Sequence, residues 1–219
     1  MSTFRDVQNS EEVKVLISRA DESLAVRGYT EHSFAHVGRV SADAGYILET
    51  LGYPERVVEL ARIAGYLHDI GNLVNRQDHA FSGALMAFRV LEKLGFDYAD
   101  IATVTTAIGN HDEDTGVAVS PVCAALILAD KADVRRTRVR NQETSGFDIH
   151  DRVNYSVKKS VLKINEDHTL IKLKLTVDTT YGSVMEYFEI FLGRMIMSCK
   201  AAERLGLLFR LIINEQQLI

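Results

Sequence analysis

The stretch "GYLHDIGNL", residues 65–73, sets a histidine beside an aspartate at the point where a helix should end. Apolar residues at helical spacing run from residue 57 to residue 67 and stop at His68 and Asp69, and Gly71 follows. Imidazole and carboxylate side chains are both ligands for divalent metal ions. Adjacent His and Asp also occur by chance, so the meaning of this pair depends on which other residues fold toward it.

The sequence on both sides of the pair has a helical pattern, from residue 10 to residue 133. Ser10 and the dipeptide Ser120-Pro121 are typical of helix starts, and glycines are typical of helix ends. Together with the apolar spacing, these signals predict helices near residues 11–27, 31–51, 54–71, 79–94 and 121–133, and one that begins at Asp97 or Asp100 and ends around Asn110.

The pattern changes after residue 140. Residues 170–178, "LIKLKLTVD", alternate strictly between apolar and polar side chains, which predicts a strand with one face toward water. Residues 160–165 should pair with it as a hairpin. A helix at residues 183–206 and a strand at residues 207–214 would complete a β-β-α-β tail, with a small antiparallel sheet packed on one helix.

A polar stretch at residues 134–151 separates the two patterns and predicts a loop. We therefore expect a mainly α fold with a small α+β appendage. The predicted domains are a helical bundle at residues 1–143 and a C-terminal module of unassigned role at residues 153–219.

Further histidines and an aspartate recur at the ends or inner faces of the predicted helices. His32 and His36 share a helical face because they lie four residues apart. His79 opens one helix and His111 follows another. Asp130 interrupts an apolar run, where an unpaired charge would be costly. Each residue alone has an ordinary explanation, such as a cap or an ion-pair partner, but together they are typical of a metal site built from facing helices.

The order of His36, His68-Asp69 and Asp130 resembles the H…HD…D pattern of the HD superfamily of metal-dependent phosphohydrolases. The blocks around these residues agree with it: "HSFAHVGRV", "IAGYLHDIGN" and "LILADKADVRR". The resemblance covers roughly residues 30–140. It implies that the predicted bundle is an HD-type catalytic domain.

His79 in "HAFSGA" and His111 in "AIGNH" resemble the extra histidines of HD branches that hold two metal ions. These blocks look like those of bacterial HD hydrolases that cleave dinucleoside tetraphosphates. The sequence lacks the "GYP" of the HD-GYP cyclic-dinucleotide phosphodiesterases. The tail after residue 140 is not part of the resemblance.

The resemblance implies a cofactor of one or two divalent transition-metal ions, drawn from Fe, Mn, Ni, Co and Zn. One ion would be held by His36, His68, Asp69 and Asp130, and the other by Asp69, His79 and His111. Asp69, shared by both, and Lys131 are the predicted catalytic residues. A metal-activated water would hydrolyse a phosphomonoester or phosphodiester bond, in a substrate that resembles a nucleotide.

Cationic residues follow Asp130 and are candidates for phosphate contact. Lys131, Arg135 and Arg136 are the nearest, and guanidinium forks suit phosphate oxygens. The alternative is a solvated helix end, which cations also favour. His32 is a third type of candidate, able to donate a hydrogen bond to the substrate. The acidic residues 112–114 are read as a solvated loop.

The composition of the chain limits which classes of binding partner we expect. The net charge of -5 argues against nucleic acid and anionic membranes and leaves a small phosphorylated substrate. No apolar run has the length of a membrane span, and Cys123 and Cys199 read as reduced core residues, so we expect a cytoplasmic protein. An exposed sheet edge in the tail would favour pairing, so a homodimer is a candidate assembly.

Two rival functions remain open from the sequence. Some HD-fold proteins with a di-iron centre are oxygenases, and the same ligands would suit iron. The chain could also be a sensor without catalysis, in which the helical half binds a nucleotide or metal and the tail passes the signal on. The arginine cluster favours phosphate chemistry over the first rival.

Overall fold

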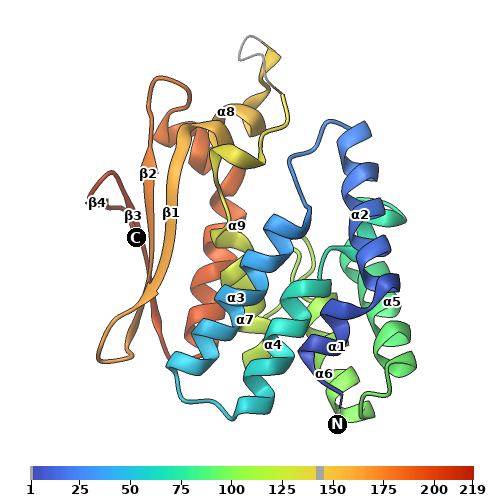
Figure 1. Ribbon diagram of the computed structural model, residues 1–219. Helices are drawn as coiled ribbons and strands as arrows, with labels where there is room; N and C mark the ends of the chain where they lie inside the picture. Colours follow the sequence, from blue (N-terminus) through green and yellow to red (C-terminus); the bar gives the residue numbers. More distant parts are fainter. Residues whose placement is uncertain (1, 142–145) are drawn as a thin grey trace.

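The computed structural model describes residues 2–141 and 146–219 of the chain. Helices form a bundle, and a small sheet stands at one side of it, as Figure 1 shows. The fold is therefore mainly α with a small β portion, as the sequence predicts. In the part of the chain that the structure describes, no helix has the length and apolar character needed to cross a membrane.

The bundle follows the predicted helical pattern. Its elements are α1 Phe4–Asn9, α2 Glu11–Val26, α3 Phe34–Thr50, α4 Glu55–Leu67, η1 Ile70–Leu73, α5 His79–Lys93, α6 Tyr98–Gly109 and α7 Pro121–Ala132. All the helices predicted between residues 11 and 133 are present. The short α1 lies outside the predicted set.

Side-chain caps fix where these helices start. Ser10 and Ser120 cap α2 and α7, as predicted. α3 starts at Phe34, later than predicted, because Ser33 is its N-cap and accepts a hydrogen bond from the backbone N–H of Ala35.

Two glycines let backbone segments approach closely around the end of α4. A Cβ on Gly65 would lie 2.8 Å from the backbone of Ser41 in α3. A Cβ on Gly71 in η1 would lie 2.0 Å from the carbonyl oxygen of His79 in α5. Because only glycine fits these contacts, the turn after α4 is held between α3 and α5.

The second half of the chain builds the sheet. After η2 Arg136–Arg138 come α8 Ile149–Ser156, β1 Val157–Ile164, β2 Leu170–Val177, α9 Val184–Arg204, β3 Leu208–Ile213 and β4 Gln216–Gln217. η2 and the start of α8 lie in the stretch 134–151 that the sequence predicts as a loop. Because this stretch is polar, its sequence did not indicate these short helical turns.

The sheet is mixed, with strand order β1-β2-β3-β4. β1 and β2 form the predicted antiparallel hairpin, but β2 and β3 are parallel. The prediction of an antiparallel sheet is therefore wrong. The reason is that α9 connects β2 to β3 as a crossover, which carries the chain back to the end of the sheet where β2 began.

α9 lies between the sheet and the bundle. It contacts β3 on one side and α7 on the other, and Figure 1 shows it running beside α7. Leu173 of β2, Met195 of α9 and Leu126 of α7 belong to one continuous cluster of buried apolar side chains. The predicted division into residues 1–143 and 153–219 stays a prediction, and its boundary at residue 143 lies outside the described residues.

Candidate metal centre

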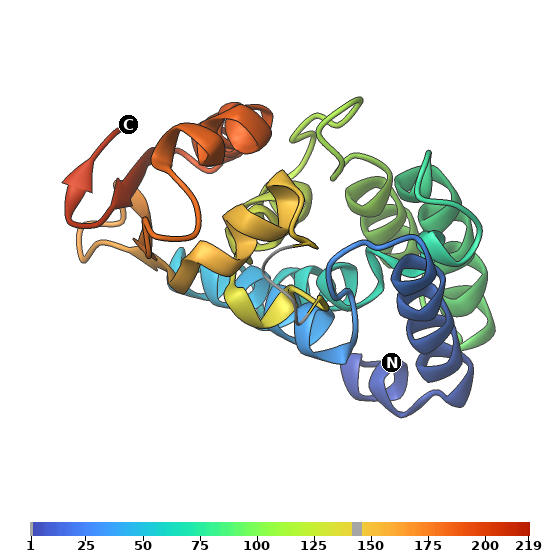
Figure 2. The ribbon, with the colours of Figure 1, turned by 90° about the horizontal axis from the view of Figure 1, so that it is seen from above.

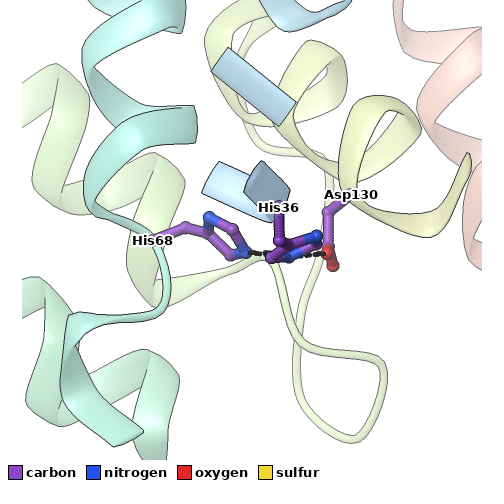
Figure 3. Close-up of side chains that lie close together, drawn as sticks. All are labelled: His36, His68 and Asp130. Carbon is purple, nitrogen blue, oxygen red and sulfur yellow. Dashed lines mark hydrogen bonds and ion pairs between the residues drawn. The ribbon is translucent and has the colours of Figure 1, made fainter. Parts of the chain in front are cut away.

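Four side chains converge on one buried point. His36 comes from α3, His68 and Asp69 follow the end of α4, and Asp130 comes from α7. These residues face one another through Nε2 and carboxylate atoms, and Figure 3 shows the convergence of His36, His68 and Asp130.

The distances among these atoms are short and similar. The Nε2 of His36 lies 3.3 Å from the Nε2 of His68 and 3.4 Å from Oδ2 of Asp69. It also lies 3.4 Å from Oδ1 of Asp130. The Nε2 of His68 lies 3.1 Å from the same Asp69 oxygen and 3.5 Å from the same Asp130 oxygen. Four potential ligand atoms therefore surround one point.

A second pair of imidazoles meets the other oxygen of Asp69. The Nε2 atoms of His79, at the start of α5, and His111, after α6, lie 3.2 Å apart. Nε2 of His79 lies 3.6 Å from Oδ1 of Asp69. Asp69 thus turns one oxygen to His36 and His68 and the other to His79, and this second oxygen also accepts a hydrogen bond from the side-chain amide of Asn72 at 2.8 Å.

Each of the four histidines has its Nδ1 atom hydrogen-bonded to an acceptor. His36 donates to Oδ2 of Asp133 at 2.8 Å. The others donate to backbone carbonyls three residues earlier, at 2.9 Å from His68 to Gly65, 3.0 Å from His79 to Arg76 and 2.6 Å from His111 to Ile108. Because these acceptors cannot donate, they fix Nδ1 as the protonated nitrogen and leave Nε2 to face inward.

The ends of α4 and α6 explain why His68 and His111 stand where they do. The last carbonyls of a helix have no partner inside the helix. Those of Gly65 and Ile108 are therefore available to the imidazoles that follow them in sequence. A histidine just past a helix end can bend back onto such a carbonyl and present its other nitrogen to the centre.

Buried charges shift the pKa values of these groups in opposite directions. Burial lowers the pKa of His68, but the carboxylates of Asp69 and Asp130 outweigh it and raise this pKa to about 10. Burial raises the pKa of Asp69, yet His68 and the other imidazoles hold it well below its usual range. Burial lowers the pKa of His111 well below its usual value. The centre therefore combines anionic carboxylates with a positively charged imidazole at His68 and a neutral one at His111.

This donor set fits a divalent metal ion. In each of two groups, His36 with His68 and Asp130, and His68 with Asp69 and His111, the potential ligand atoms all lie within 4.8 Å of one another. Imidazole and carboxylate suit Fe, Mn, Co, Ni and Zn. Rings anchored through the second nitrogen are typical of ligating histidines. The His/Asp cluster is thus suited to bind metal.

A chain of ion pairs leads away from Asp130. Its Oδ2 lies 2.8 Å from Nζ of Lys131, which lies 2.5 Å from Oε2 of Glu113. Oε1 of Glu113 in turn lies 2.7 Å from Nε of Arg194 in α9. The expectation of a solvated acidic loop is therefore wrong for Glu113, because two cations contact its carboxylate.

A cavity of about 410 Å³ opens onto the centre. This volume lies in the range of small-molecule sites. Its wall contains Asp69, Asp130, His79 and His111 together with positively charged side chains from several elements, namely Arg27, Arg76, Lys131, Arg138 and Arg194.

Segments beyond the bundle also reach this cavity. Asp148, His150, Asp151 and Asn154 from the start of α8 line it, as does Phe191 of α9. Figure 2 shows α8 over the middle of the molecule, between the sheet with α9 and the helical bundle. The second half of the chain therefore supplies part of the site's wall.

The predicted substrate-binding residues fall into two groups. His32 and Lys131 line the cavity. Among the described residues of its wall, Arg135 and Arg136 do not occur. Arg135 donates from Nε to Asp133 at 2.7 Å, and Arg136 donates from Nε to the carbonyl of Tyr155 at 2.6 Å. Their contact with substrate stays a prediction.

Sequence reasoning overlooked several residues of the centre. Asp133 could have been found, because it follows Asp130 by one helical turn in the same apolar run. Arg76 lies close to His79 in sequence, which is a weak signal. Arg194 has no signal of this kind, because it is far from the motif residues in sequence and reaches the site only through the packing of α9 on α7.

In comparisons with known proteins, the chain matches the model of one family. The profile of a family described as HD domain matches residues 33–138. Among solved structures, one similar chain is a predicted HD superfamily hydrolase from an uncultured Thermotogales bacterium. It is 28% identical, and the match covers 57% of this chain and 67% of that chain with a TM-score of 0.45. No curated protein matches the chain.

The matched segment contains every residue that faces the centre: His36, His68, Asp69, His79, His111 and Asp130. The order of these residues in the sequence follows the H…HD…D pattern, and the structure brings them together around the carboxylate of Asp69. Residues 33–138 are therefore similar to HD domains in sequence, and their His/Asp residues form one cluster suited to bind metal.

Proposed function

We propose that this chain is a metal-dependent phosphohydrolase that cleaves a phosphomonoester or phosphodiester bond in a small substrate. The observation that carries the proposal is the position of Asp69, between two groups of inward-facing imidazoles at the base of a cavity whose wall carries five arginine and lysine side chains beside five aspartates. We propose that His36, His68, Asp69 and Asp130 hold one divalent ion, and that Asp69, His79 and His111 hold a second.

The bound ions would supply positive charge for phosphoryl oxygens and acidify a water molecule. The protein's own residues orient the metal ligands and balance their charge. Asp133 and the backbone carbonyls hold the imidazole rings, and Lys131 neutralises the outer oxygen of Asp130. The wall of the cavity then attracts the anionic substrate through Arg76, Arg138 and Arg194.

We further propose a nucleotide-like substrate. Tyr29 is exposed and lines the same cavity as the charged residues. An aromatic face of this kind can stack on a base while arginines contact phosphate. The polar side chains Asp148, Asp151 and Asn154 in the wall offer acceptors for hydroxyl groups.

The cations of the wall and the position of Asp69 separate this proposal from the two rivals. A di-iron oxygenase would need the same His/Asp ligands but has no general need for several cations beside them. A sensor without catalysis would need no water-activating site, yet Asp69 keeps both oxygens directed at imidazoles. The arrangement favours hydrolysis of a phosphate ester.

The test is a hydrolysis screen on protein loaded with Mn²⁺ or Fe²⁺. The substrates would be p-nitrophenyl phosphate, bis-p-nitrophenyl phosphate and nucleoside mono-, di- and triphosphates, with oxygen consumption recorded in parallel. We expect phosphate-ester cleavage that Asp69→Asn lowers by more than about 100-fold, because the variant loses the shared ligand. Oxygen consumption without phosphate-ester cleavage would support the oxygenase instead. Metal binding without either activity would support the sensor.

A further inference from the structure

Arg194 connects α9 to the cavity, although it lies beyond residues 33–138 that match the HD domain. Its Nε donates to Oε1 of Glu113 at 2.7 Å. Its Cζ lies 4.4 Å from the ring centroid of Phe191, one turn earlier in α9. A guanidinium fixed by a carboxylate and by an aromatic face is held in one orientation.

The rest of this guanidinium is not engaged. Within residues 2–141 and 146–219, the two Nη groups of Arg194 have no hydrogen-bond partner. The side chain is 24% exposed, and it lines the cavity of the metal centre and a neighbouring cavity of about 680 Å³. Two adjacent N–H groups are therefore available to a ligand in the cavity.

Other cations in the wall are already engaged with the protein. Lys131 contacts Glu113 and Asp130. Arg138 is buried and donates to the backbone carbonyls of Glu31 and Asp133. These two cations contribute charge to the site, whereas Arg194 also retains unused donors, as do Arg27 and Arg76, whose hydrogen bonds use Nη1 alone. Such paired donors suit two oxygens of one phosphate group.

Arg194 is also linked to the metal centre through two intervening side chains. Glu113 joins its guanidinium to Lys131, and Lys131 contacts the carboxylate of Asp130. Asp130 and Arg194 also line the same cavity, so a phosphorylated ligand in it can approach both side chains.

We propose that Arg194 is a phosphate-binding residue of this site, supplied by α9 from outside the HD domain. Its Nη groups would donate hydrogen bonds to two phosphate oxygens of the substrate, while its Nε donates to Glu113. The inference rests on the proposed phosphohydrolase function. It assigns to the C-terminal half of the chain a direct part in substrate binding.

The first test compares two arginine variants on Mn²⁺-loaded protein. Arg56 is a matched control, because its side chain is 23% exposed, its Nε donates to Asp100 and its Cζ lies 5.4 Å from the ring centroid of Phe96. Arg56 lies outside the wall of the cavity as described. Losing a charge-assisted contact should raise KM for the best phosphate ester roughly 10- to 100-fold in Arg194→Gln. KM in Arg56→Gln should equal that of the wild type.

A conservative variant and a binding measurement complete the test. Arg194→Lys keeps the charge but loses the fork, so its KM should lie between those of the wild type and Arg194→Gln. Calorimetric titration with inorganic phosphate should give the same order of affinities. Melting temperatures of both Gln variants identify any loss that is due to unfolding alone.

The outcomes separate the inference from the function on which it rests. If the wild type hydrolyses phosphate esters and Arg194→Gln has the KM and the phosphate affinity of Arg56→Gln, the inference is overturned and the function stands. If no phosphate ester is hydrolysed, the proposed function fails, and the phosphate titration alone decides. Equal phosphate affinity in all variants, or no binding at all, overturns the role of Arg194.

Discussion

The four histidines of the centre all direct Nε2 toward the interior, because the Nδ1 of each one donates a hydrogen bond on the opposite side of the ring. For His36 the holding group is a charged side chain, Asp133, rather than a backbone carbonyl. Burial raises the pKa of Asp133, but His36 and Arg138 hold it below its usual range, so it is an anion. An anionic partner makes the imidazole a stronger ligand as well as fixing its orientation.

Asp133→Asn should therefore weaken metal binding while leaving all direct ligands in place. Loss of such an outer partner typically costs 10- to 100-fold in metal affinity, and we expect about that here. Competition with a fluorescent chelator would measure it. Asp43→Asn is the control, because Asp43 and Asp133 both contact Arg39 but only Asp133 contacts an imidazole of the centre. Equal affinity in both variants would limit Asp133 to a structural role.

The two cysteines should differ in reactivity. Cys123 is buried, and burial raises its pKa to about 11, whereas Cys199 is half-buried and its pKa is raised by burial to a lesser extent. Because the thiolate is the reactive form, iodoacetamide at pH 8 should alkylate Cys199 first, and modification of Cys123 should rise as the pH approaches 11. Peptide mass spectrometry would measure both rates. Faster labelling of Cys123 would contradict its burial in the folded protein.

At the scale of elements, the approach of η1 to α5 determines where Asp69 lies relative to His79. Gly71 makes that approach feasible. In Gly71→Ala the new methyl group would meet the backbone of α5, so one of the two elements must move. We expect a loss of about 1–3 kcal/mol in the free energy of unfolding, as in other overpacked sites.

The same variant should also disturb the centre. Urea unfolding would measure its stability, and elemental analysis would measure the metal retained per chain. Gly38→Ala in α3 is the control, because a Cβ there meets nothing within 4 Å and alanine favours the helix. If Gly71→Ala were as stable as Gly38→Ala, the close contact between η1 and α5 would not constrain the fold.

The individual helices and strands also show which features could be predicted from the sequence and which could not. The helices of the bundle were predictable because apolar spacing marks them, serine caps mark the starts of α2 and α7, and glycines follow the ends of α2, α3 and α5. The parallel pairing of β2 with β3 was not, because alternation along residues 170–178 reports burial and not the direction of the neighbouring strand. Likewise the motif indicated His36, His68, Asp69 and Asp130, while Arg194 depends on how α9 packs.

At the scale of the whole molecule, the centre places buried carboxylates and imidazoles where the bundle helices meet. A cation at that point should stabilise the fold, because it binds the folded chain and not the unfolded one. At a thousandfold excess of metal over Kd, the stabilisation is about 4 kcal/mol. For a chain of this size, we expect chelation to lower Tm by roughly 8–16 °C.

Differential scanning fluorimetry with and without EDTA would measure this shift. Asp69→Asn provides the matched comparison, because it keeps the shape of the side chain but removes the shared charged ligand. Its Tm should respond little to EDTA. A wild-type Tm that is unchanged by EDTA after Mn²⁺ loading would contradict metal binding at the centre.

The continuous core joins the two parts into which the chain was predicted to divide, residues 1–143 and residues 153–219. α7 carries both Asp130 and a set of buried apolar residues, and α9 covers part of that helix. Ser160 of β1 also donates to the carbonyl of Ala132 at the end of α7. A chain that ends at residue 152 would therefore expose apolar surface directly beside the metal centre.

We expect such a truncated chain to be poorly soluble, to bind the hydrophobic dye ANS and to unfold without a sharp transition. Circular dichroism and ANS fluorescence on residues 1–152 would measure this. A cooperatively folded fragment that binds metal would instead establish the bundle as an independent domain. In the first case, loss of activity on truncation would reflect loss of the fold. The contribution of the C-terminal half to catalysis must then be measured with the point variant at Arg194 in the full chain.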